Sequence, residues 1–164
     1  MKQLLIIRHA KSSWDNAFMS DFDRPLNERG LRDAPMMAAR LMQQKVEVDA
    51  LVSSPANRAL STARLFAKAW GIPEKQIVQI PALYHAPAPV FYDVIANELK
   101  SAWKTVAIFS HNPGITYFVN DLQVAKVDNM PTCGVFGVAA LTQNWAQFAE
   151  AEKRFWFFDY PKKM

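Results

Sequence analysis

The sequence predicts an α/β fold, a three-layer α/β/α sandwich with a mostly parallel central sheet, built as one domain over residues 1–164. Short, uninterrupted apolar runs, which are typical of strands buried on both faces, alternate with segments whose apolar residues recur at helical spacing. A length of 164 residues suits a single hydrophobic core. Apolar residues make up 51% of the chain and charged residues 21%, and no repeat or low-complexity linker divides it, so one globular unit is expected.

The first predicted strand comprises residues 4–7, which are all branched and apolar. A polar segment, residues 11–24, follows as a loop that lies over the end of this strand. Apolar residues at helical spacing then predict a helix that continues to about residue 44, and Asn27 is a suitable N-cap for it. Because proline removes a helical hydrogen bond, Pro35 indicates either a kinked helix or one whose regular part begins close to the proline.

The second predicted strand, residues 49–54, leads directly into a second helix. Pro55 suits the first turn of that helix, because its missing N–H would have no partner there, and Ser53 or Ser54 would cap it. Gly71 ends the helix, since glycine readily adopts the left-handed backbone that closes a helix.

The second half of the chain continues the alternation. Residues 77–83 are expected to form a short extended connection, residues 90–99 a helix, and residues 105–111 a third buried strand. The remaining predicted elements are a helix opened by Asn112-Pro-Gly and two strands, paired antiparallel, at residues 134–141 and 153–159.

Charge, cysteine content and the N-terminal segment restrict the compartment and the partners. The net charge of +4 is modest and the cations are spread along the sequence, so nucleic acid is not an expected partner. The one cysteine, Cys133, cannot form an internal disulfide, which suits a reducing compartment. The N-terminal apolar run is too short for a signal peptide or a membrane span. These features predict a cytoplasmic protein with no membrane partner.

Arginine and histidine residues occur where three predicted strands end. Arg8 and His9 follow the first strand, Arg58 lies in the first turn after the second, and His111 ends the third. If these strands are parallel, the four side chains converge in the crevice at one edge of the sheet. Arginine suits the oxygens of a phosphate, and a neutral histidine can attack phosphorus. The pattern therefore predicts phosphoryl transfer through a histidine; without a cysteine pair or a His-Glu-x-x-His spacing, neither a metal nor another cofactor is expected.

Four segments resemble the histidine phosphatase superfamily, which has the phosphoglycerate-mutase-like fold, and within it the short SixA-type phosphohistidine phosphatases. Each motif alone is weakly specific, but the four occur in the family's order through essentially the whole chain. They are RHAKSSWD at residues 8–15, DRPLNERG at 23–30, SSPANRALSTA at 53–63 and SHNPG at 110–114.

The resemblance implies a role for each of the four convergent residues. His9 matches the nucleophile that becomes phosphorylated, and Arg8 the arginine beside it. Arg58 matches the second phosphate-binding arginine, and His111 the histidine that donates a hydrogen bond to the transferring group. These roles agree with the chemistry of in-line phosphoryl transfer, which needs a positioned nucleophile and cations around the phosphoryl oxygens.

Other candidate site residues have two interpretations each. Lys11 and Ser12 either line the mouth of the crevice as substrate-binding residues or lie in solvent. His85 is either an ordinary loop residue or part of the site. Cys133 is expected to be a small apolar packing residue.

The sequence departs from the family pattern at two places. Many members have glycine after the nucleophile and a phosphate-binding asparagine five residues further on, where this chain has Ala10 and Asp15; a carboxylate beside phosphate would repel it, so Asp15 is not expected to be a ligand. Larger members supply an acidic residue to protonate the leaving group near Tyr84-His85, a segment with no carboxylate here, although His85 could serve. Because a phosphoramidate nitrogen leaves readily once protonated, this gap favours phosphohistidine over sugar phosphates.

These observations predict a phosphatase that hydrolyses the phosphoryl group of a protein histidine through a covalent phospho-His9 intermediate. The expected partner is a phosphorylated protein, such as a phosphotransfer domain or a sugar-transport phosphocarrier, and a shallow, open pocket is expected to receive it. A broad small-molecule phosphomonoesterase that takes small phosphorylated substrates is the alternative within the superfamily. A non-catalytic phosphate-binding protein is the alternative of a different class.

Overall fold

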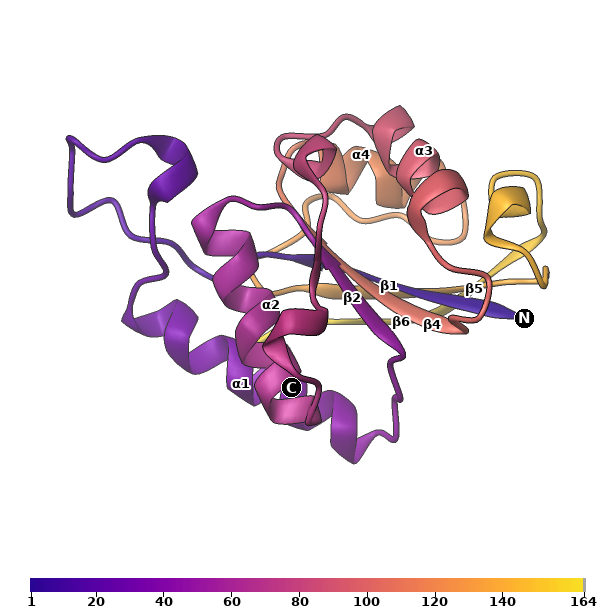
Figure 1. The fold of residues 1–164 in the computed structure, drawn as a ribbon, viewed down its shortest axis with the longest axis horizontal. Helices are drawn as coiled ribbons and strands as arrows, with labels where there is room; N and C mark the ends of the chain where they lie inside the picture. The colour runs from indigo at the N-terminus through magenta and orange to yellow at the C-terminus, as the bar shows by residue number, and fades with distance from the viewer. Residues whose placement is uncertain (164) are drawn as a thin grey trace.

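The computed structural model describes residues 1–163 and contains one six-stranded sheet with four α-helices (Figure 1). The strands are β1 (Lys2–Arg8), β2 (Ala50–Ser53), β3 (Val78–Gln79), β4 (Thr105–Ser110), β5 (Val135–Ala140) and β6 (Lys153–Asp159). The α-helices are α1 (Glu28–Gln43), α2 (Asn57–Trp70), α3 (Ala88–Glu98) and α4 (Gly114–Asp121). Short 3-10 helices are η1 (Asp21–Asp23), η2 (Glu74–Gln76), η3 (Pro81–Leu83) and η4 (Trp145–Gln147).

The sheet has the strand order β3-β2-β4-β1-β5-β6. Four neighbouring strands, β3, β2, β4 and β1, are parallel, whereas β5 runs antiparallel to β1 and β6 antiparallel to β5. The predicted α/β class, the mostly parallel sheet and the antiparallel final pair are therefore confirmed.

The helices cover both faces of the sheet, which gives three layers (Figure 1). Successive residues of a strand point to opposite faces, and both faces of β1 are buried. Leu4 and Ile6 pack into the cluster that includes α3 and α4, whereas Leu5 and Ile7 pack into the cluster that includes α1 and α2. The continuous apolar run of the first strand thus reflects burial on both sides.

Helix α1 begins well before its proline. Asn27 caps it as predicted, because its side chain accepts a hydrogen bond from the Gly30 amide. Pro35 lies on the exposed face inside the helix, where water can reach the carbonyl group that the proline leaves without a partner. Gly30 is required for close packing, since a Cβ there would lie 2.2 Å from the carbonyl oxygen of Lys11.

Two predicted details around β2 are wrong. Helix α2 begins at Asn57 without a side-chain cap, so neither Ser53 nor Ser54 caps it. The Ser53 hydroxyl bonds within its own strand end, and the Ser54 oxygen accepts from the amide of Ala56, which precedes the first turn. The stretch expected as a plain connection contains β3, a two-residue strand paired with β2, followed by η3. The predicted helix end at Gly71 is confirmed, with its backbone left-handed at φ 71°.

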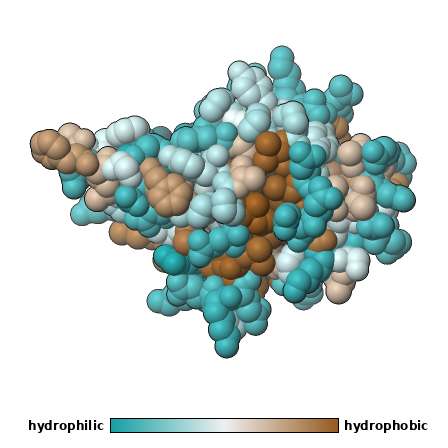
Figure 2. All heavy atoms as spheres, turned by 45° about the horizontal axis from the view of Figure 1, so that its top comes forward, coloured by the Kyte–Doolittle hydropathy of each residue, from teal (hydrophilic) through white to brown (hydrophobic). Residues whose placement is uncertain are grey.

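The loop between β1 and α1 projects from the body of the molecule, at the left of Figure 1. Its apolar side chains Trp14, Phe18, Met19 and Phe22 are exposed, and apolar atoms lie at the tip of the projection in Figure 2. Across the described part of the chain, residues 1–163, no helix has the length and apolar character needed to cross a membrane.

Candidate active site

Three parallel strands bring the predicted residues to the same edge of the sheet. β4 lies between β1 and β2, and the pairing places Arg8 beside Ser110 and Ser53 beside Phe109. Beyond the last pairs, the His9 amide donates to the Ser110 carbonyl at 3.2 Å and the Ser54 amide to the Phe109 carbonyl at 3.0 Å. The structure therefore places the ends of all three strands side by side, as the parallel arrangement requires.

His9 lies at the centre of the cluster with one ring nitrogen oriented for nucleophilic attack. Its Nδ1 lies 2.7 Å from the Ala10 carbonyl oxygen, and because a carbonyl only accepts, the proton is on Nδ1. The lone pair of Nε2 then accepts a hydrogen bond of 3.4 Å from Nε of Arg58. The ring is 6% exposed, and its rotation is fixed from both sides.

The environment keeps His9 neutral. The pKa of His9 is lowered to about 3, chiefly by burial and further by the charges of Arg58, Arg8 and Arg24, while the hydrogen bond that Nδ1 donates to the Ala10 carbonyl opposes this lowering. A neutral imidazole whose Nε2 carries no proton is the form that can attack phosphorus.

Backbone contacts hold the end of β1 rigidly. The Ala10 amide donates to Oγ1 of Thr62, and that hydroxyl donates to the Arg58 carbonyl at 2.7 Å. The Cys133 amide lies 3.1 Å from the Arg8 carbonyl and 3.0 Å from that of His9. Thr62 lies one turn after Arg58, so a single hydroxyl couples the backbone after His9 to the first turn of α2.

Arg8 and His111 each keep a buried nitrogen without a hydrogen-bond partner among residues 1–163. Arg8 donates from Nη1 to the Met130 carbonyl, while its Nε is unpaired. Nε2 of His111 lies 2.7 Å from Oγ of Ser54, and its Nδ1 is unpaired. Burial, followed by the charges of His9 and Arg58, lowers the pKa of His111, so its ring is neutral. The Ser54 oxygen already accepts from the Ala56 amide, so we assign the Ser54 hydroxyl as donor to Nε2 and the ring proton to Nδ1. Two buried donors are then available to an oxyanion.

Asp21, on η1, is the residue that the sequence analysis missed. Its Oδ2 accepts from Nη2 of Arg58 at 3.1 Å, from the Tyr84 hydroxyl at 2.7 Å and lies 3.0 Å from Nε2 of His85. Its Oδ1 lies 3.3 Å from Nε of Arg24, and its backbone carbonyl accepts from Nη1 of Arg58 at 2.7 Å. A carboxylate therefore does reach the Tyr84-His85 segment, but it comes from the loop after β1.

Asp21 is ionised. Partial burial alone would raise the pKa of Asp21, but the hydrogen bonds from Tyr84 and His85 and the charge of Arg58 outweigh it and hold the pKa well below its usual range. The sequence holds one weak sign that Asp21 pairs with an arginine: in Asp21-Phe-Asp-Arg, an acid lies close to an arginine in a polar loop.

His85 joins the cluster from the loop before α3. Its backbone is left-handed at φ 51°, its ring lies 4.2 Å from that of Tyr84 and 5.3 Å from that of His111, measured between centroids. Gly114 makes this approach possible, since a Cβ there would lie 1.7 Å from the Ala86 carbonyl oxygen.

Lys11 and Ser12 line a hollow of about 640 Å³ together with Asp15, and its lining includes neither His9, Arg58 nor His111. Asp15, where the family pattern has a phosphate-binding asparagine, is exposed there.

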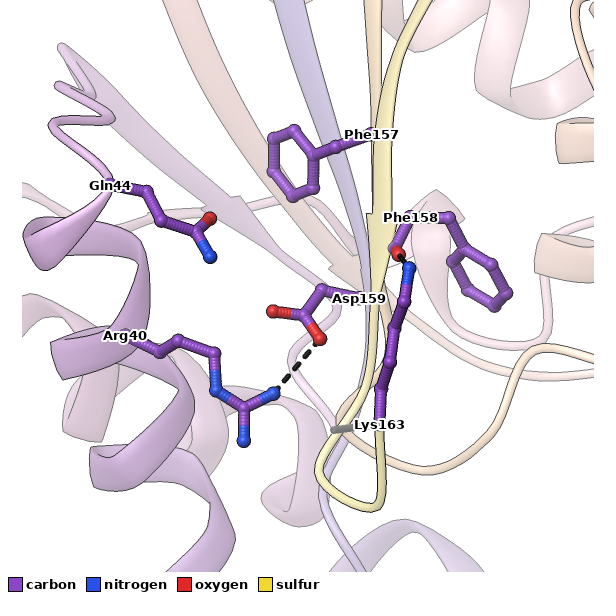
Figure 3. Close-up of a pocket in the computed structure, with 6 residues that line it drawn as sticks. All are labelled: Arg40, Gln44, Phe157, Phe158, Asp159 and Lys163. Carbon is purple, nitrogen blue, oxygen red and sulfur yellow. Dashed lines mark hydrogen bonds and ion pairs between the residues drawn. The ribbon is translucent and has the colours of Figure 1, made fainter.

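A second hollow, of about 460 Å³, lies between α1 and β6 and has a structural explanation (Figure 3). Arg40 crosses it to form a 2.9 Å ion pair with Asp159 and also donates to the Tyr160 carbonyl. Lys163 donates from Nζ to the Phe158 carbonyl. The Arg40 bonds attach the C-terminal strand and its tail to α1, and the Lys163 bond holds the tail against β6. Within residues 1–163 no three His, Cys, Asp or Glu side chains are grouped to hold a metal ion.

The buried histidines predict a stability that falls in mild acid. The unfolded chain binds a proton at each histidine near pH 6.5, whereas folded His9 remains neutral until about pH 3, so stability is full above pH 6.5 and is lost as the pH falls toward 3. His111 acts in the same direction. Each histidine contributes a slope of up to about 1.4 kcal/mol per pH unit. Urea unfolding at a series of pH values checks this: His9→Gln should show a shallower slope below about pH 6, and parallel wild-type and variant slopes would contradict it.

Comparisons with known proteins agree with this geometry. Residues 4–83 match the profile described as the histidine phosphatase superfamily, branch 1. Phosphohistidine phosphatase SixA of Escherichia coli (strain K12) is 27% identical over 146 residues, which cover 87% of each protein. A crystal structure assigned as the phosphohistidine phosphatase SixA of Agrobacterium tumefaciens gives a TM-score of 0.77 at 25% identity, covering 98% of both chains. The protein histidine phosphatase SixA complexed with tungstate gives 0.80 at 24% identity and 97% of both chains.

The six-stranded sheet and the similar solved structures define the class of this protein as a phosphoglycerate-mutase-like α/β fold. Within that class, residues 4–83 match the histidine phosphatase superfamily, and the whole chain is similar to SixA phosphohistidine phosphatases. This similarity supports a phosphatase activity.

Proposed function

We propose that this protein is a phosphohistidine phosphatase that removes the phosphoryl group from a protein histidine through a covalent phospho-His9 intermediate, without a metal ion. The observation that carries the proposal is the orientation of His9: Nδ1 donates to the Ala10 carbonyl, and the lone pair of Nε2 is directed at Arg58. Likeness to SixA proteins supports the substrate class.

The reaction has two transfers. In the first, Nε2 of His9 forms a bond to phosphorus while the bond from phosphorus to the substrate nitrogen breaks. Arg58 and Arg8 neutralise the phosphoryl oxygens, and Nδ1 of His111 donates to one of them. In the second, water attacks phosphorus, the bond to Nε2 breaks, and the product leaves as dihydrogen phosphate with both hydrogens of the water, which returns His9 to its neutral form.

The charge of the site and the exposed apolar surface of the loop after β1 support a substrate that is an anionic group on a protein. Arg8, Arg24 and Arg58 act on the site together with the single carboxylate of Asp21, so two net positive charges meet the two negative charges of a phosphoryl group. The exposed apolar side chains of the loop after β1 offer contact area to a phosphotransfer domain or a phosphocarrier.

A rapid-quench experiment tests the proposal. A phosphocarrier labelled on histidine is mixed with enzyme in EDTA, and we expect a transient acid-labile, alkali-stable label that maps to His9, together with faster turnover of phosphohistidine than of alkyl phosphate esters. A preference for the esters would favour a small-molecule phosphomonoesterase instead. Phosphate binding without turnover of either substrate would leave a phosphate-binding protein.

A further inference from the structure

The cluster has a buried floor and an exposed mouth. The floor consists of His9, Arg58 and His111, which are 6%, 3% and 1% exposed. The mouth consists of Asp21 and His85, whose side chains are 42% and 49% exposed, and of Tyr84, which contacts both. A substrate therefore meets Asp21 before it reaches the nucleophile.

In-line transfer gives the floor and the mouth of the cluster different functions. The nucleophile and the leaving group lie on opposite sides of phosphorus, so a phosphoryl group attacked from the floor by His9 releases its leaving group toward the mouth. Arg58 spans this direction, since its Nε contacts Nε2 of His9 while Nη1 and Nη2 contact Asp21. The carboxylate of Asp21 thus lies on the leaving-group side of the transfer.

The position of Asp21 is fixed independently of any substrate. Tyr84, His85 and Arg58 hold Oδ2, and Arg24 holds Oδ1. A carboxylate offers about four acceptor sites, and Oδ2 already has three partners, so the oxygen with room for a further donor is Oδ1, which has only Arg24. A partly exposed, fixed anion attracts a cationic group and repels an anionic one.

We propose that Asp21 is the specificity-determining residue of this site: its carboxylate accepts the N–H of a protonated phosphoimidazole and so selects phosphoramidates over phosphate monoesters. This inference rests on the proposed function. On the leaving imidazole, Asp21 holds the ring N–H while the opposite nitrogen releases phosphorus. The Ala10 carbonyl has the same role on His9, where it holds the N–H at Nδ1 while Nε2 bonds to phosphorus.

The chemistry balances without a proton transfer. The bond from phosphorus to the substrate nitrogen breaks as the bond to Nε2 of His9 forms, and the imidazole leaves neutral, still carrying the N–H that Asp21 accepted. An ester differs, because its oxygen leaves with negative charge unless an acid protonates it. Asp21 carries no proton to give, because its pKa lies well below its usual range, so the same carboxylate opposes the departure of an alkoxide or a phenolate.

Asp21→Asn tests the proposal, because it removes the charge and keeps the shape. The measurement is the ratio of kcat/KM for 1-phosphoimidazole to kcat/KM for p-nitrophenyl phosphate, taken on one enzyme preparation so that the folded fraction cancels. We expect this ratio to fall about tenfold or more, because kcat/KM for 1-phosphoimidazole falls. Asp23→Asn is the matched control: it removes a carboxylate of the same short helix that bonds only Ser20, and the ratio should not change.

Two outcomes would overturn the proposal. An unchanged ratio in Asp21→Asn, with both substrates slowed equally, would mean that Asp21 only orients Arg58. A selective loss on p-nitrophenyl phosphate would mean that Asp21 acts as a general acid. Failure of the proposed function is seen separately, in the wild-type enzyme, as a ratio that already favours the ester.

Discussion

His9→Ala is expected to lower phosphatase turnover by about 10⁴-fold or more, because no other side chain can form the covalent bond to phosphorus. The neighbouring histidines cannot replace it: His111 has Nε2 bonded to Ser54, and His85 lies at the mouth beside Asp21. The measurement is kcat/KM for phosphohistidine, combined with the rapid-quench assay, in which the variant should acquire no acid-labile label.

His9→Asn is the matched variant for this prediction. Its side-chain amide can still donate to the Ala10 carbonyl, so the backbone after β1 should keep its place, yet it has no nucleophilic nitrogen. Equal loss in both variants, with unchanged urea midpoints for His9→Asn, would locate the defect in the chemistry. A His9→Ala enzyme as active as the wild type would refute the proposed mechanism.

Arg58→Met is expected to lower kcat/KM by about 10²- to 10³-fold, because it removes the buried cation that faces the nucleophile. It should also raise the pKa of His9, since Arg58 is one of the charges that lowers it, although burial of the ring still keeps that pKa below its ordinary value. NMR titration of the His9 ring measures the second effect independently of activity.

Arg64→Met serves as the control for Arg58. Arg64 is on the same helix, about half exposed, and forms an ion pair with Glu74. Its loss should leave both activity and the His9 titration unchanged. If Arg58→Met leaves the pKa of His9 unchanged, the contact between the two side chains has no electrostatic effect.

The sequence predicted the residues whose positions depend on the sheet. Arg8 ends β1, while His9 and His111 follow β1 and β4, so their convergence depends only on apolar runs and strand direction. Arg58 could be predicted for the same reason, because it lies in the first turn of the helix that follows β2.

Asp21 could not be predicted in this way. It lies in a long polar loop without periodicity, and its place is set by contacts with Arg58, Tyr84 and His85, residues distant in the chain. β3 was missed for a related reason, since a two-residue strand has too few residues to show alternation and exists through its pairing with β2. Ser54 was interpreted from its local position as a cap, whereas its hydroxyl contacts His111, which follows another strand, β4.

The unpaired buried nitrogens of Arg8 and His111 have a consequence for inhibition. Among residues 1–163 the protein offers these donors no acceptor. An oxyanion that bonded to both would add two buried hydrogen bonds to the folded state, so released phosphate is expected to stabilise the folded enzyme as it occupies the site. Tolerance to heat and sensitivity to product inhibition would then rise together, because the same two hydrogen bonds would produce both.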